Sequence, residues 1–529
     1  MRPEDKERVL AECAQRVFDR YAHDPQRLES AIFDTIYEER RRLEGERRSQ
    51  RTAAESALYD RIYAEAAAAA PERRRELLRE LIGRFADEVV GHFDPRVYAL
   101  ATRAVPLGLN VLLNSLSPLR LAGLLPGGVS RLEDQLTIAG EIDAFRRMVE
   151  RGTTIVVSTH CSNLDSVLLG YALHRLGLPP YVYGAGLNLF SNRLIGFFMH
   201  HLGAYKVDRR KKAWLYKEVL KTYAGCTIEA GYHNMFFPGG TRSRSGAVES
   251  RLKLGLLGMG LDAYIRNLQA NRPRPDVFIV PVTLNYQLVL EAETLIEDHL
   301  KEAGKSRYII EDDEFSKPRR VLDFVQRLFS LNSRISMVVG RPLDVFGNTV
   351  DDEGRSLDRR GRTVDRRRYV QRDGAVTFDA QRDEEYTREL AASVVESFRR
   401  NTVLQSTQVV SRVAFEWLRE QNPEQDLYRL LRTGGKHSSI PLPQAYARLS
   451  RAISALRTME SAGRLRLEDT IKDRDVVAVM SDALAHLAGY HRRPALLRRG
   501  DRLFHEDRNL ILYYQNRLEG IPLPREAAA

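Results

Sequence analysis

Short runs rich in β-branched residues alternate with amphipathic helical patterns through the middle of the chain. Residues 153–159 form the first clear run, and apolar residues then recur at helical spacing from Val167 to Leu176. Strands that alternate with helices are typical of an α/β fold with a largely parallel central sheet flanked by helices. Further strands are expected at 181–183, 204–207, 234–237, 277–284 and 335–339, and helices at 211–223 and 252–268.

Helical patterns dominate on both sides of this segment. Apolar residues recur at helical spacing before residue 95, as at Leu77, Leu81 and Phe85, and a mainly helical pattern returns after residue 384. At 529 residues the chain is too long for one core. The predicted organisation is an N-terminal helical region (1–95), an α/β domain (96–345), an insertion (346–383) and a C-terminal helical domain (384–529).

A five-residue pattern recurs with a period of seven within the insertion, at 347–351, 354–358 and 361–365. Each unit combines a glycine, a hydroxyl residue, an aliphatic residue and an aspartate. Glycine in every unit is incompatible with a coiled coil and predicts stacked turns, each anchored by its aliphatic residue. We interpret the repeat as a structural insertion, and a basic docking arm is the functional alternative.

The charge balance is modestly basic, with 82 Lys and Arg against 71 Asp and Glu and a net charge of +11. Such an excess suits phosphorylated ligands or an anionic membrane surface. The sequence has no zinc-finger spacing and no aromatic-basic recognition signature, so nucleic acid is not expected as a partner. Its three cysteines have no paired spacing, which favours a reducing compartment.

An uncharged stretch at residues 104–119 is the nearest approach to a membrane segment. Prolines and asparagines interrupt it, and Arg103 and Arg120 flank it. It is shorter than the ~20 apolar residues that a spanning helix needs. We expect it to lie on a bilayer or to re-enter it, with a buried helix pair as the alternative. The first residues lack a signal-peptide pattern, and the predicted location is the cytoplasmic face of a membrane, peripheral or monotopic.

A histidine with an aspartate five positions later follows the first predicted strand. Functional groups of α/β proteins gather at the carboxyl ends of strands, where His160 is placed. A base for acyl transfer to an alcohol needs a second group that holds its tautomer, and Asp165 in the first helical turn meets that need. We therefore predict that His160 and Asp165 are catalytic. Cys161 is interpreted as a small residue in a tight turn, because no cysteine-nucleophile signature surrounds it.

Two later segments supply groups for binding an anion. The loop after the strand at 234–237 contains Gly239, Gly240, Thr241, Arg242, Ser243 and Arg244. Glycines let backbone N–H groups approach an anion, and arginine binds phosphate oxygens through its fork of donors. Arg209 ends another predicted strand. We expect Arg209, Gly240, Thr241, Arg242, Ser243 and Arg244 to bind a phosphorylated substrate.

Four blocks in this order resemble the glycerolipid acyltransferases, the family of glycerol-3-phosphate and lysophosphatidate acyltransferases. The blocks are 160–165, 203–209, 237–246 and 280–286, with weaker similarity at 401–403 and 512–518. The resemblance implies that His160 is the general base, that Asp165 orients it, and that Arg209 and the 240–244 loop bind the acceptor phosphate. The third block departs from the family pattern, because Gly239 stands where a glutamate is usual.

These observations predict an enzyme that moves a fatty acyl group from acyl-CoA or acyl-carrier protein to the sn-1 hydroxyl of glycerol 3-phosphate, in phospholipid biosynthesis. The alternatives are lysophosphatidate as the acceptor, or a catalytically inactive peripheral membrane protein. We expect no cofactor beyond the acyl thioester co-substrate. We also expect no metal, because the sequence has neither a His-Glu-x-x-His motif nor a Cys/His cluster.

Overall fold

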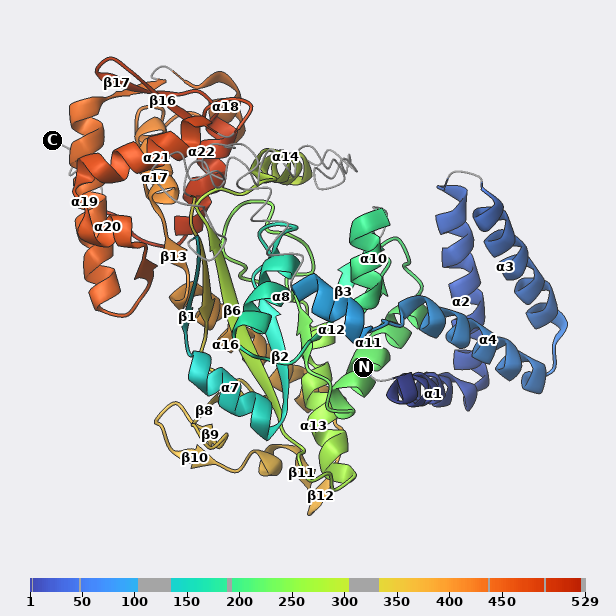
Figure 1. The fold of residues 1–529 in the computed structure, drawn as a ribbon. Helices are drawn as coiled ribbons and strands as arrows, with labels where there is room; N and C mark the ends of the chain where they lie inside the picture. The colour runs from blue at the N-terminus through green and yellow to red at the C-terminus, as the bar shows by residue number, and fades with distance from the viewer. Residues whose placement is uncertain are drawn as a thin grey trace.

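The computed structural model describes residues 1, 3–46, 49–102, 135–187, 193–303, 333–435, 438–489 and 491–524 (Figure 1). The predicted membrane-contacting stretch at 104–119 lies outside these residues. None of the helices within the described ranges is both long and apolar enough to cross a bilayer.

A seven-stranded sheet forms the centre of the molecule, in the order β1-β7-β6-β2-β5-β3-β4. Neighbouring strands are parallel at every pairing except that of β6 with β7. The predicted α/β fold with a largely parallel sheet is therefore confirmed. The strands are β1 (Leu136–Gly140), β2 (Thr153–Ser158), β3 (Val182–Gly186), β4 (Ala204–Val207), β5 (Asn234–Phe236), β6 (Val277–Tyr286) and β7 (Ile335–Val339).

Alternate side chains of β2 point to the two faces of the sheet. Ile155 and Val157 belong to the apolar cluster that includes residues of three helices on one face. Val156 belongs to the cluster of the other face, with α7 (Ile142–Arg151) and α8 (Asp165–Arg175). β2 is buried along its whole length, and its apolar residues at 155–157 pack alternately on the two faces. The three helices are α12 (Leu254–Leu257), α13 (Met259–Gln269) and α16 (Ala380–Arg400).

One strand of this seven-stranded sheet was not predicted. β1 is an edge strand whose residues are mostly half-buried or exposed, so its sequence has no continuous apolar run. It pairs with β7 and ends at Gly140, whose φ is +98°. A Cβ at this glycine would lie 2.1 Å from the carbonyl oxygen of Val339. Backbone proximity, and not a hydrophobic pattern, defines the end of this strand.

Four N-terminal helices form a separate layer at the β4 edge of the sheet, coloured blue in Figure 1. Their apolar residues share a cluster with α11 (Trp214–Glu229), which includes Leu77, Leu81 and Phe85 as predicted. The helices are α1 (Pro3–Ala22), α2 (Pro25–Glu44), α3 (Gln50–Ala68) and α4 (Pro71–Val89).

A buried ion cluster lies inside this layer. Lys211, which follows β4, places its Nζ atom 3.1 Å from Oε2 of Glu39 and 2.8 Å from Oε2 of Glu88. Arg42 places Nη2 2.8 Å from the same Glu39 oxygen. Because Glu39 and Lys211 are both buried, the cluster links α2 and α4 to the α/β domain through charges that water does not screen.

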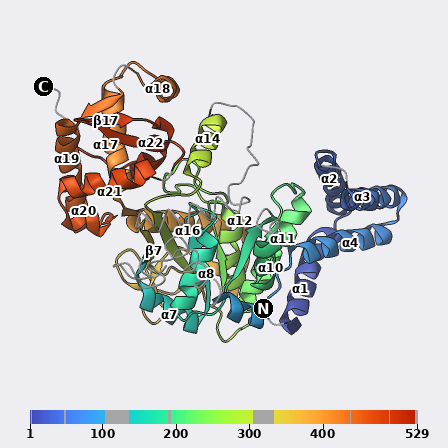
Figure 2. The ribbon, with the colours of Figure 1, turned by 45° about the horizontal axis from the view of Figure 1, so that its top comes forward.

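The C-terminal region packs on the end of the sheet from which the block residues extend (Figures 1 and 2). Its core is continuous with one face of the sheet, since Val409, Leu449 and Leu510 share a cluster with Val156 and Val280. The helices are α17 (Ser406–Glu420), α18 (Leu427–Thr433), α19 (Leu442–Ser461), α20 (Asp469–Asp473), α21 (Val476–Gly489) and α22 (Arg508–Gln515).

The seven-residue repeat forms a small antiparallel sheet in the order β10-β9-β8, from β8 (Thr349–Val350), β9 (Ser356–Leu357) and β10 (Thr363–Val364). The predicted turns are present, with Gly354 and Gly361 at φ +78° and +77°. In the second turn the Asp358 carboxylate accepts the backbone N–H groups of Arg360 and Arg362. The strands between the turns were not predicted, because two residues are too few to show a period.

Replacing Lys211 by methionine is expected to lower the free energy of unfolding by about 3 kcal/mol, because buried Glu39 and half-buried Glu88 lose a cation. Urea unfolding followed by circular dichroism measures the effect. The exposed neighbour Lys212 gives the matched control, and Lys212→Met is expected to change stability by less than about 0.5 kcal/mol. Equal stability of the two variants would contradict the assigned role of the cluster.

Candidate active site

The predicted catalytic pair meets at the carboxyl end of β2. His160 lies two residues beyond the strand, and Asp165 is the first residue of α8. The ring Nδ1 of His160 lies 2.8 Å from Oδ2 of Asp165. A carboxylate oxygen only accepts, so Nδ1 carries the proton and Nε2 is left as the basic nitrogen.

The Asp165 carboxylate is fully buried and has several donors. Its Oδ2 also accepts the backbone N–H groups of Cys161, at 2.6 Å, and Ser162, at 2.9 Å. Its Oδ1 accepts the hydroxyl of Tyr286, the last residue of β6. Burial and the Asp165 charge raise the pKa of the Tyr286 phenol, which therefore stays protonated as a donor.

Neighbouring side chains fix the ring and exclude a thiol nucleophile. The Phe237 ring stacks on the His160 ring, with centroids 4.0 Å apart and planes 14° apart. The Cys161 side chain is buried, and this burial raises the pKa of its thiol above the usual range. A protonated buried thiol is a poor nucleophile, so the structure agrees with the interpretation of Cys161 as a turn residue.

The third block folds back onto the histidine. The backbone N–H of Ser243 donates to the carbonyl oxygen of His160 at 2.7 Å, and the Ser243 hydroxyl donates to the carbonyl oxygen of Ala247. Gly240 has a φ of +77°, and a Cβ there would collide with the Lys253 side chain. Only glycine fits this turn without strain. The segment therefore builds one rigid loop over the end of β2.

Arg242 of this loop faces a buried carboxylate that the sequence did not reveal. Its Nη1 lies 3.2 Å from Oε1 of Glu291, which is fully buried. Glu291 also accepts the Ser162 hydroxyl at 2.9 Å and the Asn163 backbone N–H at 3.0 Å. Burial raises the pKa of Glu291, and the Arg242 charge opposes that rise. The one feature of the sequence that could have pointed to Glu291 is its position shortly after β6.

The other two predicted arginines lie near Arg242. Loss of hydration, and then the positive charges of Arg242 and Arg244, lower the pKa of the Arg209 guanidinium. Like charges that come this close favour an anion between them. Arg244 places Nη1 2.6 Å from Oε2 of Glu302 on α14 (Ala292–Ala303), whose side chain is largely exposed. The three arginines that the sequence predicted to bind phosphate thus lie near enough for their charges to interact.

Arg517 joins the C-terminal region to this site. Its Nη2 donates to the carbonyl oxygen of Leu284 at 3.0 Å and to Oδ1 of Asn285 at 2.9 Å. The same Asn285 oxygen accepts the backbone N–H of Val403 at 3.1 Å. The two weaker sequence similarities, at 401–403 and 512–518, therefore meet at β6. Sequence reasoning did not single out Arg517, because its partners are distant in the chain.

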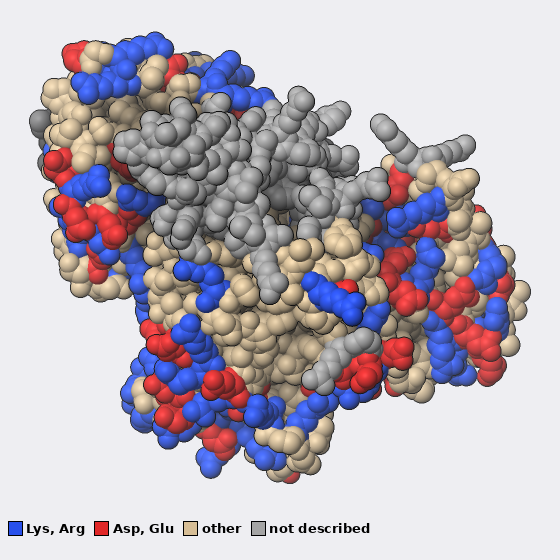
Figure 3. Space-filling view, in the orientation of Figure 1, with Lys and Arg blue, Asp and Glu red and all other residues tan. Residues whose placement is uncertain are grey.

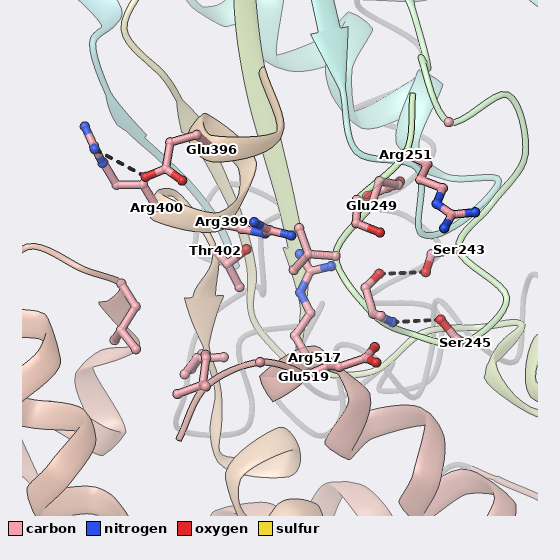
Figure 4. Close-up of a pocket in the computed structure, with 18 of the residues that line it drawn as sticks. Ser243, Ser245, Glu249, Arg251, Glu396, Arg399, Arg400, Thr402, Arg517 and Glu519 are labelled. Atoms are coloured by element: carbon pink, nitrogen blue, oxygen red, sulfur yellow. Dashed lines mark hydrogen bonds and ion pairs between the residues drawn. The ribbon is translucent and has the colours of Figure 1, made fainter. Parts of the chain in front are cut away.

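A cleft of about 1130 Å³ lies between the α/β domain and the C-terminal region (Figure 4). Third-block residues form one wall, and arginines of the C-terminal side form the other. The residues that line this cleft do not include His160, Asp165, Arg209 or Gly240. The lining includes Thr241, Arg242, Ser243, Arg244, Glu249, Arg399, Arg400 and Arg517.

A second, apolar cavity of about 240 Å³ lies beside α8. Gly170 and Leu173 of α8 line it, together with Tyr183 of β3 and Met199 of α10 (Arg193–His201). The face of the α/β domain visible in Figure 3 is largely uncharged between two groups of charged residues. Ser166 and Val167, directly after Asp165, also line this cavity, which therefore starts next to the catalytic pair.

Comparison with known proteins identifies the domain that carries this site. Residues 142–285 match the family model described as Acyltransferase. This segment is similar to the acyltransferase domains that the model describes. It contains all four blocks apart from Tyr286, and the resemblance to the glycerolipid acyltransferases is confirmed.

Three similar proteins illustrate the relationship, each named "Glycerol-3-phosphate acyltransferase". One from Actinobacillus succinogenes is 34% identical over 193 residues, 36% of this chain and 23% of the relative. One from Aeromonas hydrophila is 35% identical over 167 residues, 31% of this chain and 20% of the relative. One from Xylella fastidiosa strain M12 is 30% identical over 171 residues, 32% of this chain and 19% of the relative. The chain thus spans less than a quarter of each relative's length.

Replacing Arg517 by methionine is expected to lower the free energy of unfolding by about 2–3 kcal/mol, because Leu284 and Asn285 lose a charged donor. Thermal and urea unfolding measure the loss. The exposed Arg493 gives the control, and Arg493→Met is expected to unfold like the parent. If Arg517→Met unfolds like the parent protein, the C-terminal region does not stabilise the α/β domain through this contact.

Proposed function

We propose that the protein is an O-acyltransferase that moves a fatty acyl group from a thioester to the sn-1 hydroxyl of glycerol 3-phosphate. The observation that carries the proposal is the contact between Nδ1 of His160 and Oδ2 of Asp165, at 2.8 Å, within an acyltransferase domain. The names of the similar proteins support glycerol 3-phosphate as the acceptor.

In the proposed reaction, Nε2 of His160 removes the proton of the sn-1 hydroxyl, and the alkoxide oxygen attacks the thioester carbonyl. The tetrahedral intermediate then expels the thiolate, which takes the proton back from the imidazolium. Asp165 keeps the ring in the required tautomer and stabilises its charged form. General base catalysis of this kind contributes about 100- to 10,000-fold, and the reaction needs no cofactor beyond the thioester.

The acceptor phosphate is proposed to bind among Arg209, Arg242 and Arg244, with the 240–244 loop supplying backbone and hydroxyl donors. The lowered pKa of Arg209 supports this assignment, since an anion would relieve the repulsion among the three guanidinium groups. Arg242 and Arg244 face carboxylates in the structure. We propose that these contacts hold the arginines in place until phosphate binds.

The apolar cavity beside α8 is proposed to take part of the acyl chain. Ser166 and Val167, directly after Asp165, line it together with Met199. The proposed location is the cytoplasmic face of a membrane, with peripheral contact to anionic lipid. The net charge of +11 supports that contact.

The first test measures transfer from acyl-CoA and from acyl-carrier protein to radiolabelled glycerol 3-phosphate. His160→Ala and Asp165→Asn are expected to lower kcat at least 100-fold, because the base or its tautomer is lost. His23→Ala is the control, since that side chain is 80% exposed. Parallel assays with lysophosphatidate test the alternative acceptor. If the parent protein acylates neither acceptor from either donor, the proposed function is wrong.

The second test concerns chain length. A Cβ on Gly170 would contact nothing within 4 Å, so Gly170→Leu extends into the cavity without disturbing other atoms. We expect the preferred acyl chain to become shorter, with a loss of about fourfold in kcat/KM for each methylene excluded from the cavity. Acyl-CoA donors of graded length measure the shift. An unchanged chain-length profile would show that the acyl chain binds elsewhere.

A further inference from the structure

Glu249 is a second carboxylate at the histidine, ten residues beyond Gly239 in the chain. Its Oε1 accepts the backbone N–H of His160 at 2.7 Å. Its side chain also occupies the space beside Gly239, where a Cβ would lie 3.3 Å from Cγ and 3.8 Å from Oε1 of Glu249. A carboxylate from just beyond the third block therefore lies beside Gly239, where the family glutamate is usual. Glu249 enters from the later part of the loop because residue 239 has no side chain.

The second oxygen of this carboxylate is buried and has no hydrogen-bond partner among the described residues. Such an atom costs free energy unless another group binds to it. Asp165 and Glu291 differ in this respect, because each of their oxygens faces a donor or a cation. Glu249 is thus the carboxylate of this site with an acceptor available for a ligand.

Glu249 also faces the cleft. Gly239 and Glu249 line one wall together, and Arg399 and Arg517 approach from the opposite wall (Figure 4). Burial raises the pKa of Glu249, and the His160 backbone N–H and the positive charge of Arg517 oppose that rise. This carboxylate is tied to the His160 backbone, and Glu249 is one of the residues that line the cleft. Its second oxygen is therefore placed to accept a hydrogen bond from a substrate hydroxyl that enters from the cleft.

We propose that Glu249 positions the acceptor: Oε1 holds the His160 backbone, and Oε2 accepts a hydrogen bond from the hydroxyl of glycerol 3-phosphate that does not react. This inference rests on the proposed function, because it assumes an acceptor with a reacting hydroxyl and a second one beside it. An acceptor without the second hydroxyl gains nothing from Glu249. The residue therefore makes the site selective for a phosphorylated diol.

The experiment compares glycerol 3-phosphate with propane-1,3-diol monophosphate, which lacks the middle hydroxyl. Binding of each to the full-length protein is measured by titration calorimetry, and KM and kcat are measured with acyl-CoA. Glu249→Ala is expected to weaken glycerol 3-phosphate binding about tenfold to a hundredfold, the usual effect of losing a hydrogen bond to a charged group. Binding of the analogue is expected to stay within about twofold.

The matched control is Glu519→Gln, because Glu519 is exposed and lines the same cleft. It is expected to leave both affinities unchanged. A purely structural role for Glu249 would weaken both ligands equally and lower the unfolding temperature. Equal losses for the diol and its analogue, or no loss for either, would overturn the inference.

A carboxylate swap gives a second test that does not depend on one variant folding well. Gly239→Glu alone places two carboxylates side by side and is expected to weaken glycerol 3-phosphate binding. Gly239→Glu combined with Glu249→Gly returns one carboxylate to the same space. Glu249→Gly alone is expected to lose the preference for glycerol 3-phosphate over its analogue. We expect the double variant to recover at least tenfold of that preference. Absence of recovery would contradict the shared location.

Measurements of binding and of catalysis together distinguish a failure of the proposed function from a failure of the proposed role of Glu249. A parent protein that binds glycerol 3-phosphate without acylating it would refute the proposed function, and the calorimetric comparison would still decide the role of Glu249. A parent protein that acylates glycerol 3-phosphate but does not distinguish it from the analogue would refute only the role of Glu249. A parent protein that binds neither compound would refute the inference directly.

Discussion

A buried carboxylate needs hydrogen-bond donors, and the donors that surround Asp165 fix the geometry of the site. The His160 ring, two backbone N–H groups of the turn and the Tyr286 hydroxyl all meet its two oxygens. Removing any donor would leave part of a charge unpaired in a dry environment, which is costly. The turn after β2, the start of α8 and the end of β6 are therefore held in one arrangement, and the histidine ring has one orientation.

Similar buried contacts extend this constraint to the rest of the chain. Glu291 ties the turn to Arg242, and Arg517 ties β6 to the C-terminal region. Gly246 lies so close to α22 that a Cβ would be 2.2 Å from the carbonyl oxygen of Tyr513. The C-terminal region consequently forms part of the site, and its arginines supply one wall of the cleft.

The carboxylates of the site divide into two chemical classes. Asp165 and Glu291 have their oxygens engaged by donors or by a cation, and they hold His160 and Arg242 in place. Glu249 has one oxygen on the His160 backbone and one without a partner among the described residues. This asymmetry separates carboxylates that hold the protein together from one suited to a ligand. It also explains how a loop with glycine at position 239 retains a carboxylate.

The sequence alone indicated the α/β fold, most strands of its central sheet and the pairing of His160 with Asp165, because β-branched runs, helical periodicity and a five-residue spacing are local features of the chain. It also assigned Arg209, Arg242 and Arg244 to one anion site, and the structure brings them together. Only the tertiary structure decided the contacts of Glu249, Glu291 and Arg517, whose partners are 89, 129 and 232 positions away in the chain. Contacts across such distances depend on how strands and loops pack, and no local pattern of residues records them.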